Sequence, residues 1–441
     1  MKILRYFLIF SILMAAVGFY PSPALAGAFT YTSGIQVQNL EGTEAEVAIT
    51  FYNPDGSVEA TVPDTIPANG SKTFFPLPMV GEGFSGSAVI SSNTQVAAIT
   101  NILGNDGAAA AAYIAASAGH TEVKIPLLMK HNSGFSTWFN VQNTGTSSAT
   151  VTVNYSTGVV ANAVIPPGSA HTFDQTLEAH DAPVFSAIVT SDQPIAAAVI
   201  EESTQIMFAY SGFGAGSTSP VLPLINANNA GYVTGVQIQN AGGVETTVTL
   251  SYTPVPGVGT ACTETQTIPA GQDRTFALGA FAGSPPPGAT TDCIGGARFV
   301  GSAQVTGNTA NQELTAIVNQ LLPGTNGEAY NGFNVAEATA KVVMPLIMDR
   351  NGGYNTGFNV MNVGASTVTV TCTFTGTSYT VSDTLGPGEA LNDIQYNKIA
   401  AGYVGSGTCE APGGQIVAVV NELGASPTAD QLLVYEGVPA P

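Results

Sequence analysis

The sequence predicts an all-β protein made of four tandem modules of one kind. Gly and Pro are abundant, at 50 and 27 of 441 residues, while charged residues make up only 9% and hydrophobic residues 44%. Gly and Pro interrupt helices, and the many Thr and Val residues suit a pleated surface, so the composition favours strands. The aliphatic content also excludes a disordered chain.

The first 26 residues are predicted to be a secretory signal peptide. Lys2 and Arg5 give a positive start, residues 7–17 are apolar, and residues 24–26 form a small-x-small cleavage site before Gly27. The apolar stretch is shorter than the roughly 20 residues that span a bilayer, and no later run is long enough. We therefore expect a secreted or cell-surface protein without a transmembrane span in the mature chain.

The mature chain is expected to be strongly acidic. Loss of Lys2 and Arg5 with the leader changes the net charge from −20 to −22. Such a field repels nucleic acids and anionic lipid surfaces, so we expect no nucleic-acid partner.

Internal repetition is the strongest signal in the chain. Each copy opens with an aromatic residue and an alternating stretch that ends at Asn, and a second alternating stretch follows. The opening stretches are Tyr31–Asn39, Phe135–Asn143, Tyr232–Asn240 and Tyr354–Asn362. Period-two alternation predicts strands with one buried face, and Asn followed by Gly suits a tight turn, so we expect a hairpin at each Asn.

Three further landmarks recur in every copy. A Pro-Gly turn comes first, then a continuous aliphatic run typical of a strand inside a sandwich, and finally a tyrosine. The aliphatic runs are Val96–Leu103, Ile195–Ile200, Leu314–Leu321 and Ile416–Leu423. The closing tyrosines are Tyr113, Tyr210, Tyr330 and Tyr435.

About seven short strands in roughly a hundred residues predict an immunoglobulin-like β-sandwich for each module. The expected boundaries are 27–119, 120–218, 219–338 (with insertions) and 339–441 for modules 1 to 4. Short connections predict a string of closely abutting modules. A closed four-bladed propeller is the alternative, although a familiar blade takes only about 40–50 residues.

The N-x-G turn, the Thr/Val strand, the I-P-P-G turn and the I-A-A-V-type strand together resemble those of secreted bacterial proteins built from tandem immunoglobulin-like modules. The resemblance covers nearly the whole mature chain, and the same scaffold recurs in bacterial surface adhesins and filament subunits. These motifs specify turns and core strands and carry no ligand. The resemblance thus implies an extracellular role only through fold and location.

Module 1 departs from the repeat at its start. Modules 2 to 4 begin with a Pro-Leu-aliphatic strand at Pro126, Pro223 and Pro345, whereas the same place in module 1 falls inside the signal peptide. After cleavage the first sandwich should lack an edge strand. An open sheet edge is a template for another chain, so head-to-tail self-association is one hypothesis and a short, tolerated edge is the other.

The chain has four cysteines, Cys262, Cys293, Cys372 and Cys409. An even number in an exported chain indicates disulfides, and pairing within modules (262–293 and 372–409) is favoured among three connectivities because those partners are close in sequence. Zinc-site spacings are absent.

No catalytic constellation is visible, so we expect a protein that is not an enzyme. The four histidines, His120, His131, His171 and His180, lack metal-ligand spacing, and the glycine cluster at 212–216 is interpreted as a linker. Glu201, Glu202 and Glu422 end core strands, where we expect solvated carboxylates rather than an acid–base pair.

Two features leave ligand binding open. Residues 53–56 and 349–352 supply turn oxygens that could hold calcium, the one cofactor considered, although both also suit metal-free hairpins. Trp138 could stack on a sugar or pack at a module junction.

The sequence thus predicts a non-enzymatic extracellular or cell-surface structural or adhesive protein. The alternative is an array that binds glycans or other surface proteins, with its site in module 3. That module departs from the others through an insertion at 255–261 and a Pro-rich loop at 284–288.

Overall fold

The computed structural model describes residues 27, 29–424 and 429–440, so the predicted signal peptide lies outside the described residues. Strands dominate; the helical elements of this part of the chain are α1 (Leu278–Ala282), η1 (Asn105–Gly107) and η2 (Val335–Glu337). No helix in these ranges has the length and apolar character needed to cross a membrane. The all-β prediction is therefore confirmed.

The strands form four units, each with an inner and an outer sheet. In unit 1 the inner order is β4-β1-β6-β7 and the outer order is β3-β2-β5. The strands of this unit are β1 (Tyr31–Asn39), β2 (Ala45–Tyr52), β3 (Val58–Ile66), β4 (Ser71–Phe74), β5 (Ser87–Ser92), β6 (Val96–Gly104) and β7 (Ala109–Ile114).

Unit 2 repeats this plan, but its long β13 runs through both sheets and joins them. The inner sheet contains β12, β9, β13 and β14, and the outer sheet contains β11, β10, β13 and β8. The strands are β8 (His120–Met129), β9 (Ser136–Asn143), β10 (Ala149–Tyr155), β11 (Val160–Ile165), β12 (Ala170–Asp174), β13 (Val184–Glu202) and β14 (Met207–Ser211).

Unit 3 has the inner order β19-β16-β22-β23 and the outer order β15-β21-β17-β18-β20. Its strands are β15 (Val221–Ala227), β16 (Val233–Asn240), β17 (Thr246–Pro254), β18 (Cys262–Ile268), β19 (Asp273–Phe276), β20 (Thr290–Thr291), β21 (Phe299–Gly307), β22 (Leu314–Leu322) and β23 (Asn326–Asn331).

Unit 4 has the inner order β28-β25-β30-β31 and the outer order β27-β26-β29-β24-β32. Its strands are β24 (Lys341–Asp349), β25 (Tyr354–Asn362), β26 (Val368–Phe374), β27 (Thr380–Leu385), β28 (Ala390–Ile394), β29 (Tyr403–Glu410), β30 (Ile416–Gly424), β31 (Leu432–Glu436) and β32 (Val438–Pro439).

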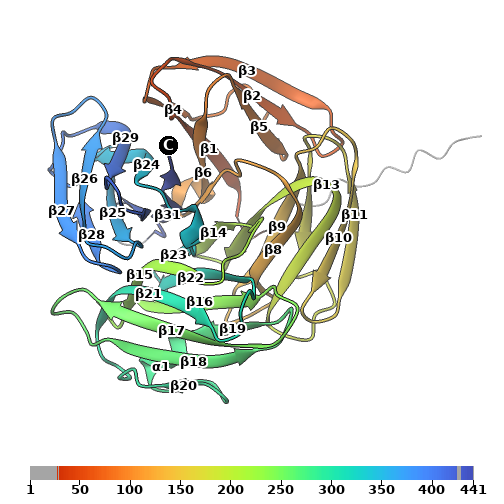
Figure 1. Ribbon diagram of the computed structural model, residues 1–441. Coiled ribbons are helices and arrows are strands. Elements are labelled where there is room, and N and C mark those ends of the chain that lie inside the picture. The colour runs from red at the N-terminus through yellow and green to blue at the C-terminus, as the bar shows by residue number, and fades with distance from the viewer. Residues whose placement is uncertain (1–26, 28, 425–428, 441) are drawn as a thin grey trace, which may run out of the picture.

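The four units close into a ring, which corrects the expectation of a string (Figure 1). The axial strands β7, β14, β23 and β31 pack against one another around the centre, and β31 packs against β7. Apolar clusters also cross the junctions: Ile99 of unit 1, for example, belongs to the core of unit 4. The structure thus has units of two sheets, as the sandwich prediction expected. Its units close into a ring, as in the propeller alternative.

Strand order within a unit differs from that of an immunoglobulin domain. There the first two strands are neighbours in one sheet, whereas in unit 2 the first two strands, β8 and β9, do not pair, and β9 pairs with β12 and β13 rather than with β10. The predicted hairpin at each Asn is therefore wrong, because the turn carries the chain from the inner to the outer sheet. What the prediction shares with the structure is the sandwich architecture.

The repeated Asn at this crossing is a fully buried hydrogen-bonding residue in all four units. In unit 3, Asn240 Nδ2 donates to the carbonyls of Val244 (2.8 Å) and Ile268 (3.0 Å), and its Oδ1 accepts from the N–H of Gly242 (3.1 Å). Asn39, Asn143 and Asn362 make the corresponding bonds. Each Asn ties the end of an inner strand to the Pro-Gly turn of the outer sheet.

The substitution Asn240→Ala should lower the free energy of unfolding by about 2–4 kcal/mol, because it leaves buried backbone groups without partners. Urea denaturation followed by circular dichroism measures the change. The matched control is Asn162→Ala on the exposed face of β11, which should change it by less than about 0.5 kcal/mol. Equal effects of the two substitutions would contradict this assignment.

The closing tyrosines hold the first strand of units 2 to 4. The hydroxyls of Tyr210, Tyr330 and Tyr435 donate to the carbonyls of Leu127, Leu224 and Leu346 and accept from the N–H groups of the same residues. Each of these leucines follows a Pro, and the strand pairing shifts register there. The tyrosine satisfies backbone groups that the Pro-induced irregularity leaves out of the ladder.

Unit 1 has no counterpart of β8, β15 and β24 among the described residues. Those strands belong to the outer sheets of units 2 to 4 and also contact the inner sheet of the next unit. Without one, the edge of β5 pairs with no strand in residues 27, 29–424 and 429–440, although Gln142 Nε2 of unit 2 donates to the carbonyl of Ala88 (3.2 Å). Ala88 and Ile90 are partly exposed, whereas the corresponding Ala187 and Val189 of unit 2 are buried.

The glutamates predicted to be solvated are buried at the junctions between units. Glu201 of unit 2 accepts from Asn319 Nδ2 of unit 3 (2.5 Å), and Glu422 of unit 4 accepts from Asn101 of unit 1 (2.9 Å). Glu202 accepts from the hydroxyl of Tyr31 (2.5 Å). Sequence reasoning failed here because the residues that cover these strand ends belong to the neighbouring unit.

Further carboxyl groups lie beside the axis. Asp430 accepts from the N–H groups of Met207 and Gly327, and Glu436 accepts from that of Asn331, so both link unit 4 to other units. Burial raises the pKa of Glu201, Glu328 and Glu422 to about 8 and that of Asp430 and Glu436 to about 7.

These shifts predict that the ring loses stability as pH rises. The folded chain holds protons that the unfolded chain releases near pH 4–4.5, so this stabilisation is complete below that range and is lost towards pH 8. The thermal unfolding temperature should fall between pH 5 and pH 8.5. The double variant Glu201→Gln, Glu422→Gln should show a weaker dependence; an unfolding temperature that rises with pH would refute the prediction.

Candidate functional site

Both disulfides lie within units, Cys262–Cys293 in unit 3 and Cys372–Cys409 in unit 4, which are the pairs that the sequence favours. Cys372 and Cys409 face each other across β26 and β29 and are fully buried. Cys262 begins β18 and joins it to the segment after β20. The two bridges therefore fasten the outer sheets of the last two units.

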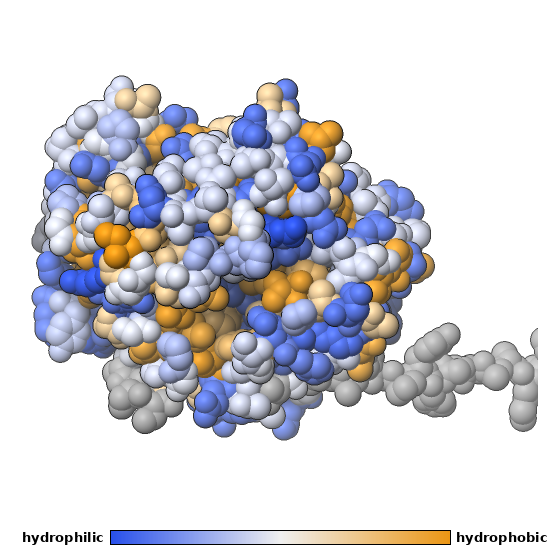
Figure 2. Space-filling model, turned by 90° about the horizontal axis from the view of Figure 1, so that it is seen from below, coloured by the Kyte–Doolittle hydropathy of each residue, from blue (hydrophilic) through white to orange (hydrophobic). Residues whose placement is uncertain are grey.

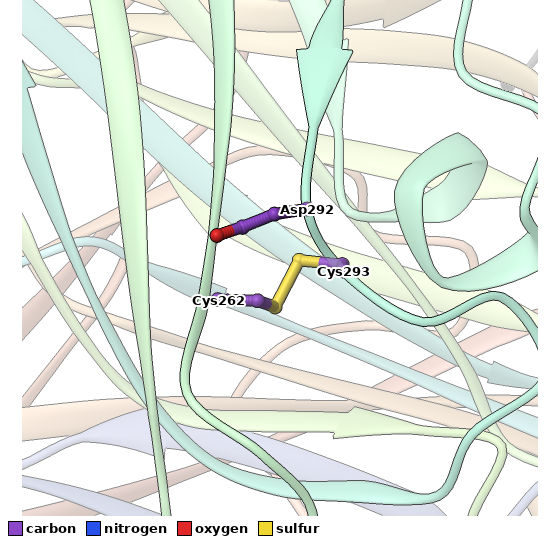
Figure 3. Close-up of side chains that lie close together, drawn as sticks. All are labelled: Cys262, Asp292 and Cys293. Atoms are coloured by element: carbon purple, nitrogen blue, oxygen red, sulfur yellow. A yellow bond between two sulfur atoms is a disulfide. The ribbon is translucent and has the colours of Figure 1, made fainter.

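Asp292 lies beside the Cys262–Cys293 bridge (Figure 3). Among the described residues, the potential ligand atoms of Cys262, Asp292 and Cys293 lie close enough together to be considered as a metal site. The two sulfurs are bonded to each other, however, and offer no thiolate. Asp292 accepts from the N–H and the hydroxyl of Thr263, and these bonds lower its pKa. The group fastens a loop and is no metal centre.

The segments considered for calcium use their carboxylates for local hydrogen bonds. Asp349 is fully buried and accepts from the N–H groups of Asn397, Lys398 and Ile399 and from Arg350. Asp55 accepts from the N–H and the hydroxyl of Ser57. Protein donors thus satisfy both oxygens of Asp349, and Asp55 uses its Oδ1 within its own turn, so neither segment supports a calcium proposal.

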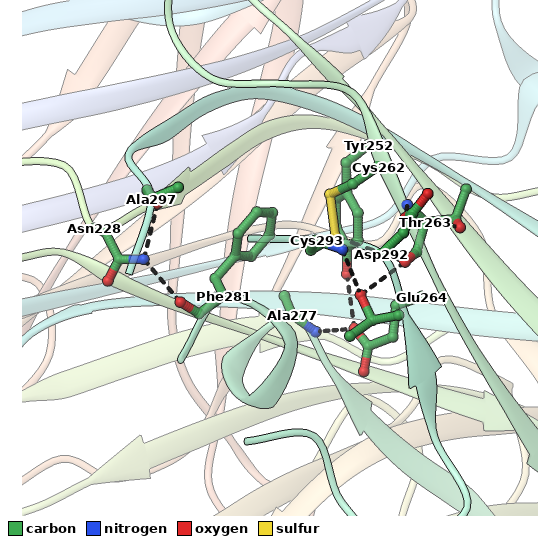
Figure 4. Close-up of a disulfide and its surroundings, with 11 residues drawn as sticks. Asn228, Tyr252, Cys262, Thr263, Glu264, Ala277, Phe281, Asp292, Cys293 and Ala297 are labelled. Atoms are coloured by element: carbon green, nitrogen blue, oxygen red, sulfur yellow. Dashed lines mark hydrogen bonds between the residues drawn. A yellow bond between two sulfur atoms is a disulfide. The ribbon is translucent and has the colours of Figure 1, made fainter. Parts of the chain in front are cut away.

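Residues near the disulfide of unit 3 form hydrogen bonds to the segments on both sides of the Pro-rich loop (Figure 4). Glu264 is buried and accepts from the N–H of Ala277, just before α1, and from the hydroxyl of Tyr252. Asn228 donates to the carbonyls of Phe281 and Ala297 on either side of the loop. The loop at 284–288 is thus anchored by α1 on one side and by Cys293 on the other.

A cleft of about 590 Å³ lies between units 2 and 3, beside this loop. Its volume is in the range of small-molecule sites, about 300–1,000 Å³. Unit 2 contributes Ser156, Thr157, Asp181, Ala182, Val184 and Phe185; unit 3 contributes Gln237, Gln266, Gln272, Asp273, Arg274, Thr275, Pro286 and Pro287.

Asp273 is the central polar group of the cleft. It accepts from Ser156 Oγ of unit 2 (3.1 Å) and from Gln237 Nε2 (2.5 Å). Gln272 donates to the carbonyl of Ser156 (3.1 Å), so three side chains join the two units. Burial raises the pKa of Asp273, while the exposed Arg274 beside it carries a positive charge.

The corresponding regions of other junctions are more closely filled. Between units 3 and 4 a cleft of about 140 Å³ remains. Between units 1 and 2, the Tyr52 ring lies so close to Gly168 that a Cβ there would stand 2.7 Å from it, and Ser87 donates to the carbonyl of Gly168. The larger cleft thus distinguishes the second junction from these two.

The residues singled out in the sequence do not gather at one site. Trp138 packs edge-on against Tyr31 of unit 1, with ring centroids 5.8 Å apart, which supports a junction role rather than an exposed sugar platform. His180 stacks on Phe185 behind the cleft, whereas His131 contacts Ser136 and His171 contacts Phe173. Sequence reasoning missed Asp273, Arg274 and Gln237, although the Pro-rich loop pointed to their unit.

No protein-family model matches the sequence, and no curated protein matches it either.

Removal of the first bridge by Cys262→Ser, Cys293→Ser should cost about 3–4 kcal/mol of stability, because the bridge closes a loop across a sequence separation of 31. Urea denaturation of the variant and of the wild-type protein, each with Cys372–Cys409 intact, measures the loss. An unchanged midpoint would show that α1 and Asn228 hold the loop without the bridge.

Proposed function

We propose that this protein is a non-enzymatic extracellular or cell-surface structural or adhesive protein, exported through the signal at residues 1–26, that self-associates head-to-tail. Two disulfides suit an oxidising extracellular compartment. The resemblance to secreted bacterial proteins with tandem modules supports the same location. The surface is compatible with such a role: in the view from below, polar and hydrophobic side chains alternate, and hydrophobic ones gather where the face is hollowed (Figure 2).

The observation that carries the proposal is the edge of β5 that pairs with no strand of the described residues; unit 2 contacts its first two residues through Gln142 and Gly168. Its sequence, Ser-Ala-Val-Ile-Ser-Ser, has no charge or proline, the devices that protect sheet edges from pairing. The opposite edge of the same sheet, β3, carries Glu59, Pro63 and Asp64. A strand of a neighbouring copy that pairs with β5 would complete the outer sheet of unit 1.

A second candidate function is that of a binding-module array with its site in unit 3. The specific observation in its favour is the cleft between units 2 and 3, which the Pro-rich loop helps to enclose. This function needs no self-association, so the two candidates are tested separately.

Analytical ultracentrifugation of the purified chain should show association that increases with concentration. The double variant Val89→Lys, Ser91→Lys adds charge to the β5 edge and should sediment as a monomer. The matched control Thr61→Lys, Thr65→Lys places the same charge on β3 and should associate like the wild type. A wild-type protein that stays monomeric at the highest attainable concentration would rule out self-association.

A further inference from the structure

The cleft between units 2 and 3 combines two kinds of surface. One part is polar and holds Asp273, Arg274, Gln237 and the hydroxyl-bearing Thr157. The other part is apolar and is built from the rings of Pro286 and Pro287 and from Val184. A ligand that fits both needs hydrogen-bonding groups along its edges and an apolar face.

The charges of the cleft argue for a neutral ligand. Arg274 is the cation of the lining, which also contains two carboxyl groups, Asp181 and Asp273. The chain as a whole carries −20, which disfavours an anionic ligand. A cation is disfavoured by the positive charge of Arg274 in the same lining.

We propose that this cleft binds a neutral saccharide, with Asp273, Arg274 and Gln237 holding ring hydroxyls and the two prolines covering an apolar ring face. The inference rests on the second candidate function. Ser156 and Gln237 already donate to Asp273, and Thr275 donates to the amide oxygen of Gln237. These oxygens keep further lone pairs and Arg274 keeps further N–H groups, so together they match vicinal hydroxyl groups, which act as both donors and acceptors. The arrangement resembles small-molecule sites in which a few polar groups fix orientation against apolar walls.

Differences between the units account for the site. Arg274 pairs with Ile238 on the inner sheet of unit 3, and Lys72 takes the corresponding place opposite Val37 in unit 1. Lys72 forms an ion pair with Asp64 (2.6 Å) and is committed to its own unit. Arg274 has no ion pair within the described residues of its unit; its Nη1 donates to the carbonyl of Asp273 (2.7 Å), and it lines the cleft together with the Pro-rich loop, which is an insertion of unit 3.

Isothermal titration calorimetry with four neutral trisaccharides tests the proposal: cellotriose, maltotriose, mannotriose and the N-acetylglucosamine trimer. At least one should bind the wild-type protein. Arg274→Ala and Asp273→Asn should each weaken that binding by roughly 10- to 100-fold, the loss expected for a hydrogen bond to a charged group. Lys72→Ala is the matched control and should leave binding unchanged, and circular dichroism verifies that each variant is folded.

The outcomes separate the inference from the function on which it rests. If neither Arg274→Ala nor Asp273→Asn weakens binding, the saccharide binds outside this cleft. The proposed site would then be wrong, while the function as a sugar-binding array would stand. Failure of all four trisaccharides to bind the folded wild-type protein would overturn the proposed ligand class. Loss of binding in Lys72→Ala to the same degree would also overturn the cleft as the site.

Discussion

Burial of the axial strands is the constraint on which the rest of the structure depends. β14 and β31 are buried along their whole length, and Ala109–Ala112 of β7 are at most 2% exposed. A unit covers only one face of its own axial strand, so the opposite face needs the neighbouring units. The ring, rather than the single module, is therefore the unit of stability, in contrast to repeat proteins in which each module contacts only its sequence neighbours.

Within a unit, the sequence predicted most strands because their signals are local. Alternation, Pro-Gly turns and aliphatic runs place the strands correctly whatever surrounds them. The pairing of strands could not be read in this way, because a turn at Asn39 suits a hairpin and a crossing between sheets equally well. The repeat of this Asn has a different cause from the one inferred: its buried side chain donates to the carbonyls of Ile66 and Pro67, which are distant in sequence.

Ring closure and the cleft escaped prediction for a common reason, namely that both are made between units. The sequence around Glu422 predicts a solvated strand end, because its hydrogen-bond partner Asn101 is 321 residues away in sequence. Asp273 and Ser156 are separated by 117 residues and belong to motifs that looked purely structural. The disulfides could be predicted because the two cysteines of each bridge lie in one unit. The Pro-rich loop indicated only that unit 3 departs from the repeat.

The seam between units 1 and 4 has a consequence for how the chain folds. It joins the earliest and the latest parts of the sequence, as the contact of β7 with β31 shows. During synthesis, Ile99 of β6 and Ala110 and Ala112 of β7 stay uncovered until the last unit has been made. Such long-range closure is slow and favours aggregation of incomplete chains. A chaperone that shields unit 1 until the last unit is made would meet a physical need of this topology.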